Sequence, residues 1–195
     1  MNQKRTQPIP WQLPQTRSGG GVTFDASNGL WFSLLEMNFD ANLMLKALGE
    51  SFVPLVLHAG QTISVNMPAG QVIITADQNR ISQTISNLLS NATKYAGEGA
   101  HIKLESIVTD SVFSVYVTDN GVGMDSEAAE NAFDLYFRAE NATTRAVSGL
   151  GLGLNISQTI IRMHDGEITI SSEIGKGTRI GFEIPRVVGG IEQAE

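Results

Sequence analysis

The chain has 195 residues, of which 42% are hydrophobic, enough to form the core of one domain. Its net charge of −7 and pI near 4.9 argue against broad binding to nucleic acid or to an anionic membrane, because such surfaces carry a basic excess. The absence of cysteine excludes disulfides, thiolate metal sites and cysteine nucleophiles. No apolar run approaches the roughly 20 residues of a membrane helix, and the N-terminus lacks the apolar segment of a signal peptide. We therefore expect a soluble chain that contacts neither nucleic acid nor membrane directly.

The N-terminal part, residues 1–29, contains Pro8, Pro10 and Pro14 and a glycine run at 19–21, with no sustained hydrophobic period. This composition favours a linker, a tail or a cloning remnant over a folded element. We expect the folded domain at residues 30–188, followed by a C-terminal tail at 189–195.

Hydrophobic patterns predict the first elements of the folded part. Leu30–Phe39 is expected to be a strand, and Asp40 to cap a helix that runs from Ala41 to about Ala59 with a kink at Pro54. The side chains expected on the inner face of this helix are Leu43, Ala47, Leu48 and Leu55. Two further strands are expected before Asp77, which caps the next helix: Ile63–Met67 and Val72–Thr75.

The helix that follows Asp77 is the most informative stretch of the chain. A buried stripe is predicted from apolar residues at the helical period: Ile81, Ile85, Leu88, Ala92 and Ala96. Along its edge runs a second stripe of Asn87, Asn91 and Lys94, with Tyr95 beside it. Asparagine carbonyls are hard oxygen ligands that suit Mg²⁺, and a lysine one turn further on would meet phosphate. The alternative is that the two asparagines only satisfy neighbouring backbone groups.

The remaining elements predict a layered fold. A hairpin is expected from His101–Val108 and Val112–Thr118, followed by a short helix at Ser126–Phe133 and a long polar loop over Asp134–Ser148 that suits a lid. A helix to about Met163 and two strands then follow, Glu167–Ser171 and Thr178–Ile184. This order predicts an α+β two-layer sandwich, in which helices cover one face of a mixed, mainly antiparallel sheet.

Two further segments have the residue types of a ligand site. Asp119 at a strand end could accept a hydrogen bond from an exocyclic amine such as that of adenine, and Gly121 and Gly123 would let the backbone approach the ring; a plain turn is the alternative. In the aromatic segment at 132–138, Phe133 suits a core anchor at least as well as a ligand contact. Arg138, at the entry to the polar loop, is a candidate phosphate contact.

The segment before the last helix alternates glycine and leucine. The leucines would point inward and the glycine amides outward, and the helix N-terminus adds a partial positive charge. The residues of this predicted phosphate cradle are Gly149, Leu150, Gly151, Leu152, Gly153 and Leu154. The spacing differs from the dinucleotide-binding fingerprint, and Gly175-Lys176-Gly177-Thr178 lacks the Walker pattern.

Taken in order, these four segments resemble the N, G1, F and G2 boxes of the catalytic and ATP-binding domain of bacterial sensor histidine kinases, in the superfamily that includes gyrase B, Hsp90 and MutL. They are Asn87–Tyr95, Asp119–Gly123, Phe133–Arg138 and Gly149–Leu154, and the resemblance covers roughly residues 39–185. It implies a Bergerat-type fold that holds ATP between the helices and a flexible lid. It further implies that Asn91 is the principal Mg²⁺ ligand and that Asn87 is its helper. Lys94 would contact phosphate. Tyr95 would pack on the adenine ring, and Asp119 would bind the adenine amino group. The remaining predicted residues, from Gly121 to Leu154, would line the nucleotide and the lid.

One position distinguishes the hydrolases of this superfamily from the phosphotransferases. Where the gyrase-like hydrolases resemble this helix, a glutamate stands one turn before the metal-binding asparagine and serves as general base for water; here that position is Asn87. An asparagine cannot take up the proton, so the resemblance implies phosphoryl transfer to an incoming nucleophile, with slow hydrolysis.

The phosphoryl acceptor of the resembled family is a histidine on a separate dimerising helical hairpin, in a motif like His-Glu-Leu-Arg-Thr-Pro. His58, His101 and His164 lack such neighbours, and structural roles are predicted for all three. The resemblance thus implies a histidine-containing dimerisation domain as partner, in the same parent protein or in another chain, and a response regulator indirectly. We expect a cytoplasmic chain, whether or not its parent is membrane-anchored, that is inactive in transfer without that domain.

Two other functions stay open at this point. An anti-sigma-factor-type serine kinase of the same superfamily also lacks the histidine hairpin. A non-catalytic module that senses nucleotide and docks through its lid would keep the same binding residues.

Overall fold

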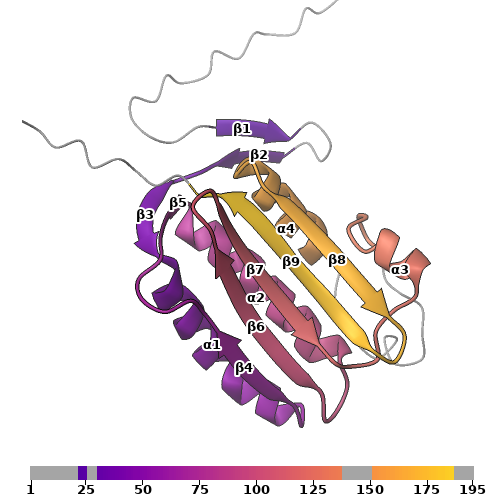
Figure 1. The fold of residues 1–195 in the computed structure, drawn as a ribbon. Helices are drawn as coiled ribbons and strands as arrows, with labels where there is room; N and C mark the ends of the chain where they lie inside the picture. Colours follow the sequence, from indigo (N-terminus) through magenta and orange to yellow (C-terminus); the bar gives the residue numbers. More distant parts are fainter. Residues whose placement is uncertain (1–21, 26–29, 138–150, 187–195) are drawn as a thin grey trace, which may run out of the picture.

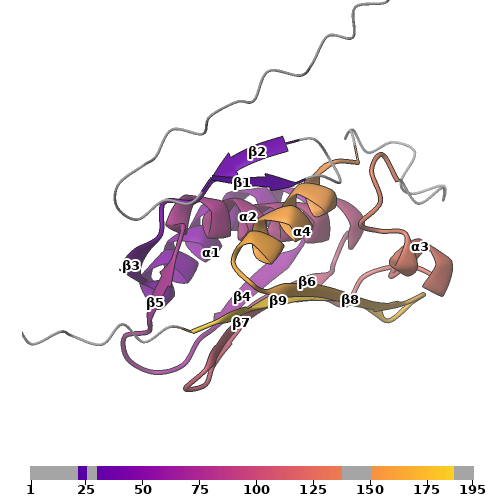
Figure 2. The same cartoon turned by 90° about the horizontal axis from the view of Figure 1, so that it is seen from above.

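The fold consists of a five-stranded sheet with helices on one face, in the part of the chain that the computed structural model describes, residues 22–25, 30–137 and 151–186 (Figures 1 and 2). The spatial order is β4-β6-β7-β9-β8. β4 and β6 pair in parallel, and every other neighbouring pair of this sheet is antiparallel. The strands are β4 (Thr62–Asn66), β6 (His101–Val108), β7 (Val112–Asp119), β8 (Glu167–Glu173) and β9 (Gly177–Pro185). The predicted α+β sandwich is confirmed.

The second layer contains α1 (Ala41–His58), α2 (Gln78–Tyr95) and α4 (Gly153–Met163), which lie side by side against the sheet (Figure 2). The short α3 (Ser126–Glu130) contacts β8 instead. The first two helices begin where the sequence predicts, because an aspartate caps each of them. Asp40 accepts from the backbone N–H of Asn42 at 3.0 Å, and Asp77 accepts from those of Asn79 and Arg80 at 3.1 Å.

The apolar stripe of α2 fills the space between the two layers. Ile81, Ile85 and Leu88 have no exposed surface, and they belong to one core cluster with Ile102 and Leu104 of β6. Burial of this stripe fixes the rotation of α2, so the stripe that carries Asn87 and Asn91 lies at the edge of the core, where both side chains are half-buried.

The single strand predicted over Leu30–Phe39 is wrong, because this segment forms two strands in two different small sheets. β2 (Leu30–Ser33) pairs with β1 (Val22–Asp25), and β3 (Met37–Asp40) pairs with β5 (Ile73–Ala76). Between them the backbone N–H of Leu35 donates to the carboxylate of Asp77 at 3.0 Å, which holds the chain where it changes sheet. β1 also lies inside the segment 1–29 that was predicted to be a linker or tail.

The inner face predicted for α1 is also wrong in part. Leu43 and Leu55 are 68% and 56% exposed and Ala47 is exposed, whereas Leu48 packs against the core as predicted. The rotation of α1 is set by Gly49, since a Cβ at this position would lie 2.4 Å from Cγ2 of Val65 in β4. This close approach turns Leu45 inward, and periodicity alone does not reveal it.

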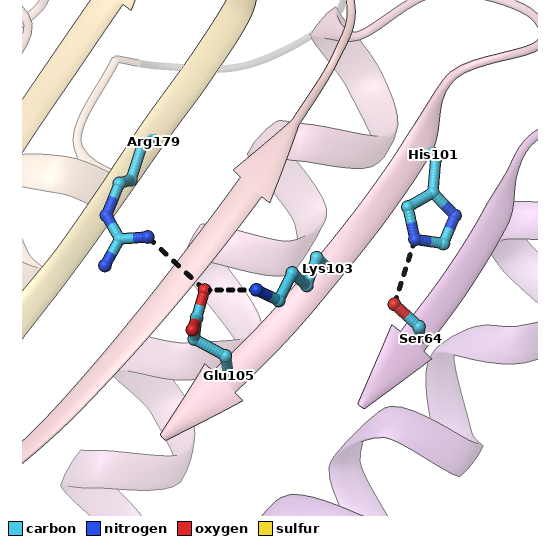
Figure 3. Close-up of polar contacts among 5 residues, drawn as sticks. All are labelled: Ser64, His101, Lys103, Glu105 and Arg179. Carbon is cyan, nitrogen blue, oxygen red and sulfur yellow. Dashed lines mark hydrogen bonds and ion pairs between the residues drawn. The ribbon is translucent and has the colours of Figure 1, made fainter. Parts of the chain in front are cut away.

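The face of the sheet away from the helices is polar (Figure 3). Glu105 pairs with Lys103 at 2.8 Å and with Arg179 at 3.3 Å, and the hydrogen bond from Lys103 lowers the pKa of Glu105 most. The His101 ring bonds to the hydroxyls of Thr62 and Ser64, both at 2.9 Å. These contacts give a solvent-facing surface to a sheet whose other face is the core, as is common for antiparallel sheets.

His164, which follows α4, joins the end of that helix to the start of α2. Its Nε2 accepts from the backbone N–H of Asp77 at 3.1 Å, so Nδ1 carries the proton and donates to the carbonyl of Ile160 at 2.8 Å. Both His164 and Asp77 are buried. The predicted structural role of His164 is therefore confirmed.

We predict that His164→Leu lowers the free energy of unfolding by about 1–3 kcal/mol, because it leaves a buried N–H and a buried carbonyl without partners. Urea denaturation checks this value. The matched control is His58→Leu at the exposed end of α1, for which a change within about 0.5 kcal/mol is expected. Equal losses in the two variants would contradict the bridging role.

Candidate functional site

The polar edge of α2 faces the first turn of α4. Nδ2 of Asn87 donates to the carbonyl of Gly153 and to Oγ of Ser157, each at 3.3 Å. Asn91 and Tyr95 are half-buried further along α2, and Lys94 is exposed. The structure therefore brings the predicted asparagine helix and the predicted glycine segment together, although they lie about 60 residues apart in the sequence.

The turn that follows β7 packs against the C-terminal end of α2. A Cβ at Gly121 would lie 2.1 Å from the carbonyl oxygen of Ala96, and the N–H of Val122 donates to that oxygen at 3.3 Å. Only glycine permits this approach. It places the Asp119 turn beside Tyr95, the last residue of α2.

Asp119 is 9% exposed at the end of β7. Its Oδ1 accepts from the N–H of Gly121 at 2.9 Å. Burial raises the pKa of this carboxyl above its usual 3.8, and hydrogen bonds from the backbone amides of Gly121 and Thr178 oppose the rise. A carboxylate that stays charged against a desolvation cost is a recognised feature of ligand sites.

Two supporting residues have no clear sequence pattern. Gln61 is 3% exposed, and its Nε2 donates to the carbonyls of Thr93 and Gly97 at 3.0 and 2.8 Å, which ties down the end of α2. Ser172 of β8 accepts from the N–H of Met124 at 2.9 Å and so supports the turn after Asp119. An isolated glutamine or serine gives no periodicity or spacing from which these contacts could be predicted.

The aromatic segment lies against the start of α4. Nδ2 of Asn155 donates to the carbonyl of Phe133 at 3.1 Å, and the Phe133 ring packs against the core, as its core-anchor alternative predicts. Gly151 has φ +68°, and a Cβ there would lie 2.9 Å from the carbonyl oxygen of Phe137. The short predicted helix ends earlier than expected, at Glu130.

Three predicted site residues, Arg138, Gly149 and Leu150, lie outside the described residues, as does most of the predicted lid at 134–148. The rest of the glycine segment is described. Leu152 precedes α4, Gly153 is its first residue, and Leu154 packs against the core as predicted. Among the described residues, no side chain forms a cap hydrogen bond at this helix start, so its first amides suit an anion such as phosphate.

The donor set fits Mg²⁺ only in combination with a substrate. Within the described part of the chain, no group of three His, Cys, Asp or Glu could hold a metal ion. Asn91 and Asn87 would supply carboxamide oxygens, and the remaining ligands would have to be phosphate oxygens and water, the arrangement that Mg²⁺ favours. The residues present therefore fit a Mg²⁺–nucleotide complex better than a free ion.

Comparison with known proteins identifies the family of the chain. The model of the family described as histidine kinase-, DNA gyrase B-, and HSP90-like ATPase matches residues 76–188. The sensor histidine kinase WalK of Bacillus subtilis (strain 168) is 36% identical over 122 residues, which make up 62% of this chain and 20% of WalK. The solved catalytic domain of histidine kinase ThkA is 26% identical with a TM-score of 0.68, and the match covers 77% of this chain and 97% of that domain. ThkA in complex with the response regulator protein TrrA matches at 25% identity with a TM-score of 0.67, over 80% of this chain and 43% of that chain.

The chain belongs to the histidine kinase-, DNA gyrase B- and HSP90-like ATPase family. Within it, this is an ATP-binding catalytic domain of the sensor histidine kinase type, as the resemblance of the four segments implies. It spans 20% and 32% of the lengths of two sensor histidine kinases that it matches. Among the described residues, no helix has the length and apolar character to cross a membrane.

We predict that Gly121→Ala destabilises the domain by about 1–3 kcal/mol, because the added methyl group forces the turn away from Ala96. Thermal and urea unfolding check this loss. Gly153→Ala is the control, since its Cβ would have its nearest neighbour at 3.7 Å, an ordinary contact. If both variants unfold alike, the close approach of Gly121 to α2 is not a real constraint.

We predict opposite effects of Asp119→Asn on stability and on nucleotide binding. Because burial raises the pKa of Asp119, its charge lowers the stability of the nucleotide-free domain above that pKa, and this cost is absent below the usual 3.8. The variant should thus be the more stable protein at neutral pH, with the difference vanishing at acid pH. If Asp119 holds the adenine amino group, the variant should lose about 100-fold or more in ATP affinity, because Oδ1 stays with Gly121 and Nδ2 faces another donor.

Calorimetric titration with ATP and urea denaturation between pH 3.5 and 8 measure the two effects. Unaltered ATP affinity in Asp119→Asn would refute the adenine contact. A stability difference that grows on acidification would refute the sign of the pKa shift.

Proposed function

We propose that this domain binds ATP with Mg²⁺ and transfers the γ-phosphoryl group to a histidine on a separate dimerisation domain. The observation that carries this proposal is the position of Asn87. It stands where a hydrolase of the family would have its glutamate base, and its amide nitrogen donates to Gly153 and Ser157 of α4. A group that donates to α4 and has no basic oxygen cannot activate water.

Each predicted residue has a role in binding and positioning. Asp119 and Tyr95 hold the adenine, and the first amides of α4 hold phosphate together with Lys94. Asn91 is the principal Mg²⁺ ligand and Asn87 its helper. Bound Mg²⁺ would neutralise the charge on the phosphate oxygens. Arg138 is a phosphate contact. The remaining predicted residues line the nucleotide and the lid: Gly121, Gly123, Phe133 and the segment from Gly149 to Leu154.

Phosphoryl transfer then requires little beyond the positioning of the reacting groups and the neutralisation of the phosphate charge. The bond between the γ-phosphorus and the β–γ bridging oxygen breaks, a bond to an imidazole nitrogen of the acceptor forms, and ADP leaves. His58 is exposed at the end of α1, His101 bonds to two hydroxyls, and His164 bonds to two backbone groups. None of the three has the neighbours of the acceptor motif, so we place the acceptor on the dimerisation domain of the parent protein or of another chain.

The proposed partners follow from the relatives. The chain covers a minor part of each sensor kinase that it matches, which leaves room in a parent protein for sensor and acceptor segments. ThkA was solved with a response regulator protein, and in our proposal a response regulator receives the phosphoryl group from the acceptor histidine, not from this domain. We place the domain in the cytoplasm, where ATP is available.

We predict that the chain, Mg²⁺ and γ-labelled ATP yield an acid-labile phosphoprotein when a matching histidine hairpin is added, and little phosphate release without it. Autoradiography after acid and alkali treatment measures this, because phosphohistidine is acid-labile. Asn91→Ala should abolish transfer while ATP binding in EDTA persists, and Ser90→Ala on the same helix is the control.

Two results would contradict the proposal. Acid-stable label on a serine of a partner protein would identify a serine kinase of the same superfamily. ATP affinity that is identical in Mg²⁺ and in EDTA, without transfer to any cognate hairpin, would identify a nucleotide-sensing module.

A further inference from the structure

Ser157 is a buried polar residue to which the proposed function assigns no role of its own in binding or transfer. It lies one turn into α4, has no exposed surface, and accepts a hydrogen bond from Nδ2 of Asn87 at 3.3 Å. The carbonyl of Gly153 accepts from the same nitrogen at 3.3 Å. The two protons of the Asn87 amide thus have two acceptors on one helix.

The chemistry of these acceptors fixes which way the Asn87 amide faces. A backbone carbonyl can only accept, so turning the amide over would bring Oδ1 of Asn87 against the oxygen of Gly153. The bonds to α4 therefore select Nδ2 as the atom that faces the Gly153 carbonyl and the Ser157 hydroxyl, and leave Oδ1 as the atom that does not bond to them. Oδ1 stays near the start of α4, 3.9 Å from where a Cβ of Gly153 would lie. The hydroxyl of Ser157 can donate as well as accept, yet it accepts here because the Gly153 carbonyl has already selected Nδ2.

We propose that Ser157 is a positioning residue, which acts through Asn87 by holding its carboxamide with Oδ1 free for the metal–phosphate group. The identity of the ligand of Oδ1 rests on the proposed function. The orientation of the carboxamide rests only on its contacts with α4. Partners of a metal-binding side chain commonly change metal affinity by about 10- to 100-fold when removed. The distances to Nδ2 are long for a hydrogen bond, so the lower end of that range applies.

The same geometry explains why a carboxylate does not suit position 87 in this chain. Aspartate is nearly isosteric with asparagine but has no donor, so one of its oxygens would face the Gly153 carbonyl oxygen and repel it. Asn87 lacks a basic oxygen for water activation. The contacts at the start of α4 thus require the same residue type, an asparagine, at this position. We therefore expect Asn87→Asp to loosen the contact between α2 and α4 in addition to changing the charge of the site.

The first test needs no nucleotide. In the free 195-residue chain, the side-chain amide signals of Asn87, assigned by NMR through Asn87→Gln, should shift in Ser157→Ala, and their protons should exchange faster with solvent. Ser82→Ala is the control, because it removes a serine hydroxyl from α2 at a position that does not contact Asn87. Unchanged Asn87 signals in Ser157→Ala would overturn the proposed positioning role of Ser157.

The second test is a double-mutant cycle in ATP affinity with Ser157→Ala, Asn87→Ala and the double variant. Ser157→Ala should raise the Mg²⁺ concentration for half-maximal ATP binding by about tenfold and leave the affinity in EDTA unchanged. In the Asn87→Ala background it should have no further effect, because its partner is already absent. Additive losses, or an equal loss in EDTA, would overturn the proposal and indicate a packing role.

Failure of the proposed function would look different from failure of this inference. If the wild-type chain does not bind ATP at all, the proposed function fails, whereas the NMR comparison still decides whether Ser157 holds the Asn87 amide. Should Ser157→Ala not fold, as judged by circular dichroism, Ser157→Cys replaces it in both tests, because a thiol of similar size is a much weaker acceptor.

Discussion

Two antiparallel helices, α2 and α4, carry most of the candidate site, and buried polar contacts fix their mutual position at two places. At the start of α2, His164 joins the end of α4 to the backbone of Asp77. Nearer the predicted phosphate position, Asn87 joins the start of α4. Between these contacts, the apolar stripe of α2 is buried on the sheet. The hydrophobic core sets the distance between the layers, and the two polar contacts set the register of the helices, because hydrogen bonds are directional and apolar packing is not. Every proposed ligand contact depends on this register.

The electrostatic design follows from the acidity of the chain. With a net charge of −7, the protein cannot attract ATP by its overall field, so attraction must be local. The uncapped start of α4 supplies amides, α2 supplies Lys94, and a metal ion would supply the rest. The adenine end of the proposed site requires a hydrogen-bond acceptor instead of a positive charge. There the proposed contact is a buried carboxyl, Asp119, whose pKa is raised by burial and lowered in part by its backbone neighbours. A neutral residue at this position is expected to make the empty site more stable, which is the usual compromise between stability and function.

The sequence predicted the class of fold and several of its element boundaries, and it was wrong at the periphery. The α2 residues, the Asp119 turn and the described part of the glycine segment were identified from residue types and order, and the structure brings them together. The inner face of α1 was predicted wrongly in part, and the division between β2 and β3 was not predicted. In both cases the decisive contact is made by a residue distant in sequence, Val65 against Gly49 and Asp77 against Leu35, and no local pattern contains that information. Gln61 and Ser157 were missed for the same reason.

What the sequence determined by itself is the class of fold and the chemistry available. Helical and strand periods are local properties, and so are the caps at Asp40 and Asp77 and the replacement of a glutamate by Asn87. What only the tertiary structure decided is the orientation of the groups that would act. The amide of Asn87 has a defined direction only because Gly153 and Ser157 lie opposite it, and Gly121 is required only because Ala96 lies against it. Orientation depends on which distant backbone groups become neighbours, and burial of the common core makes them so.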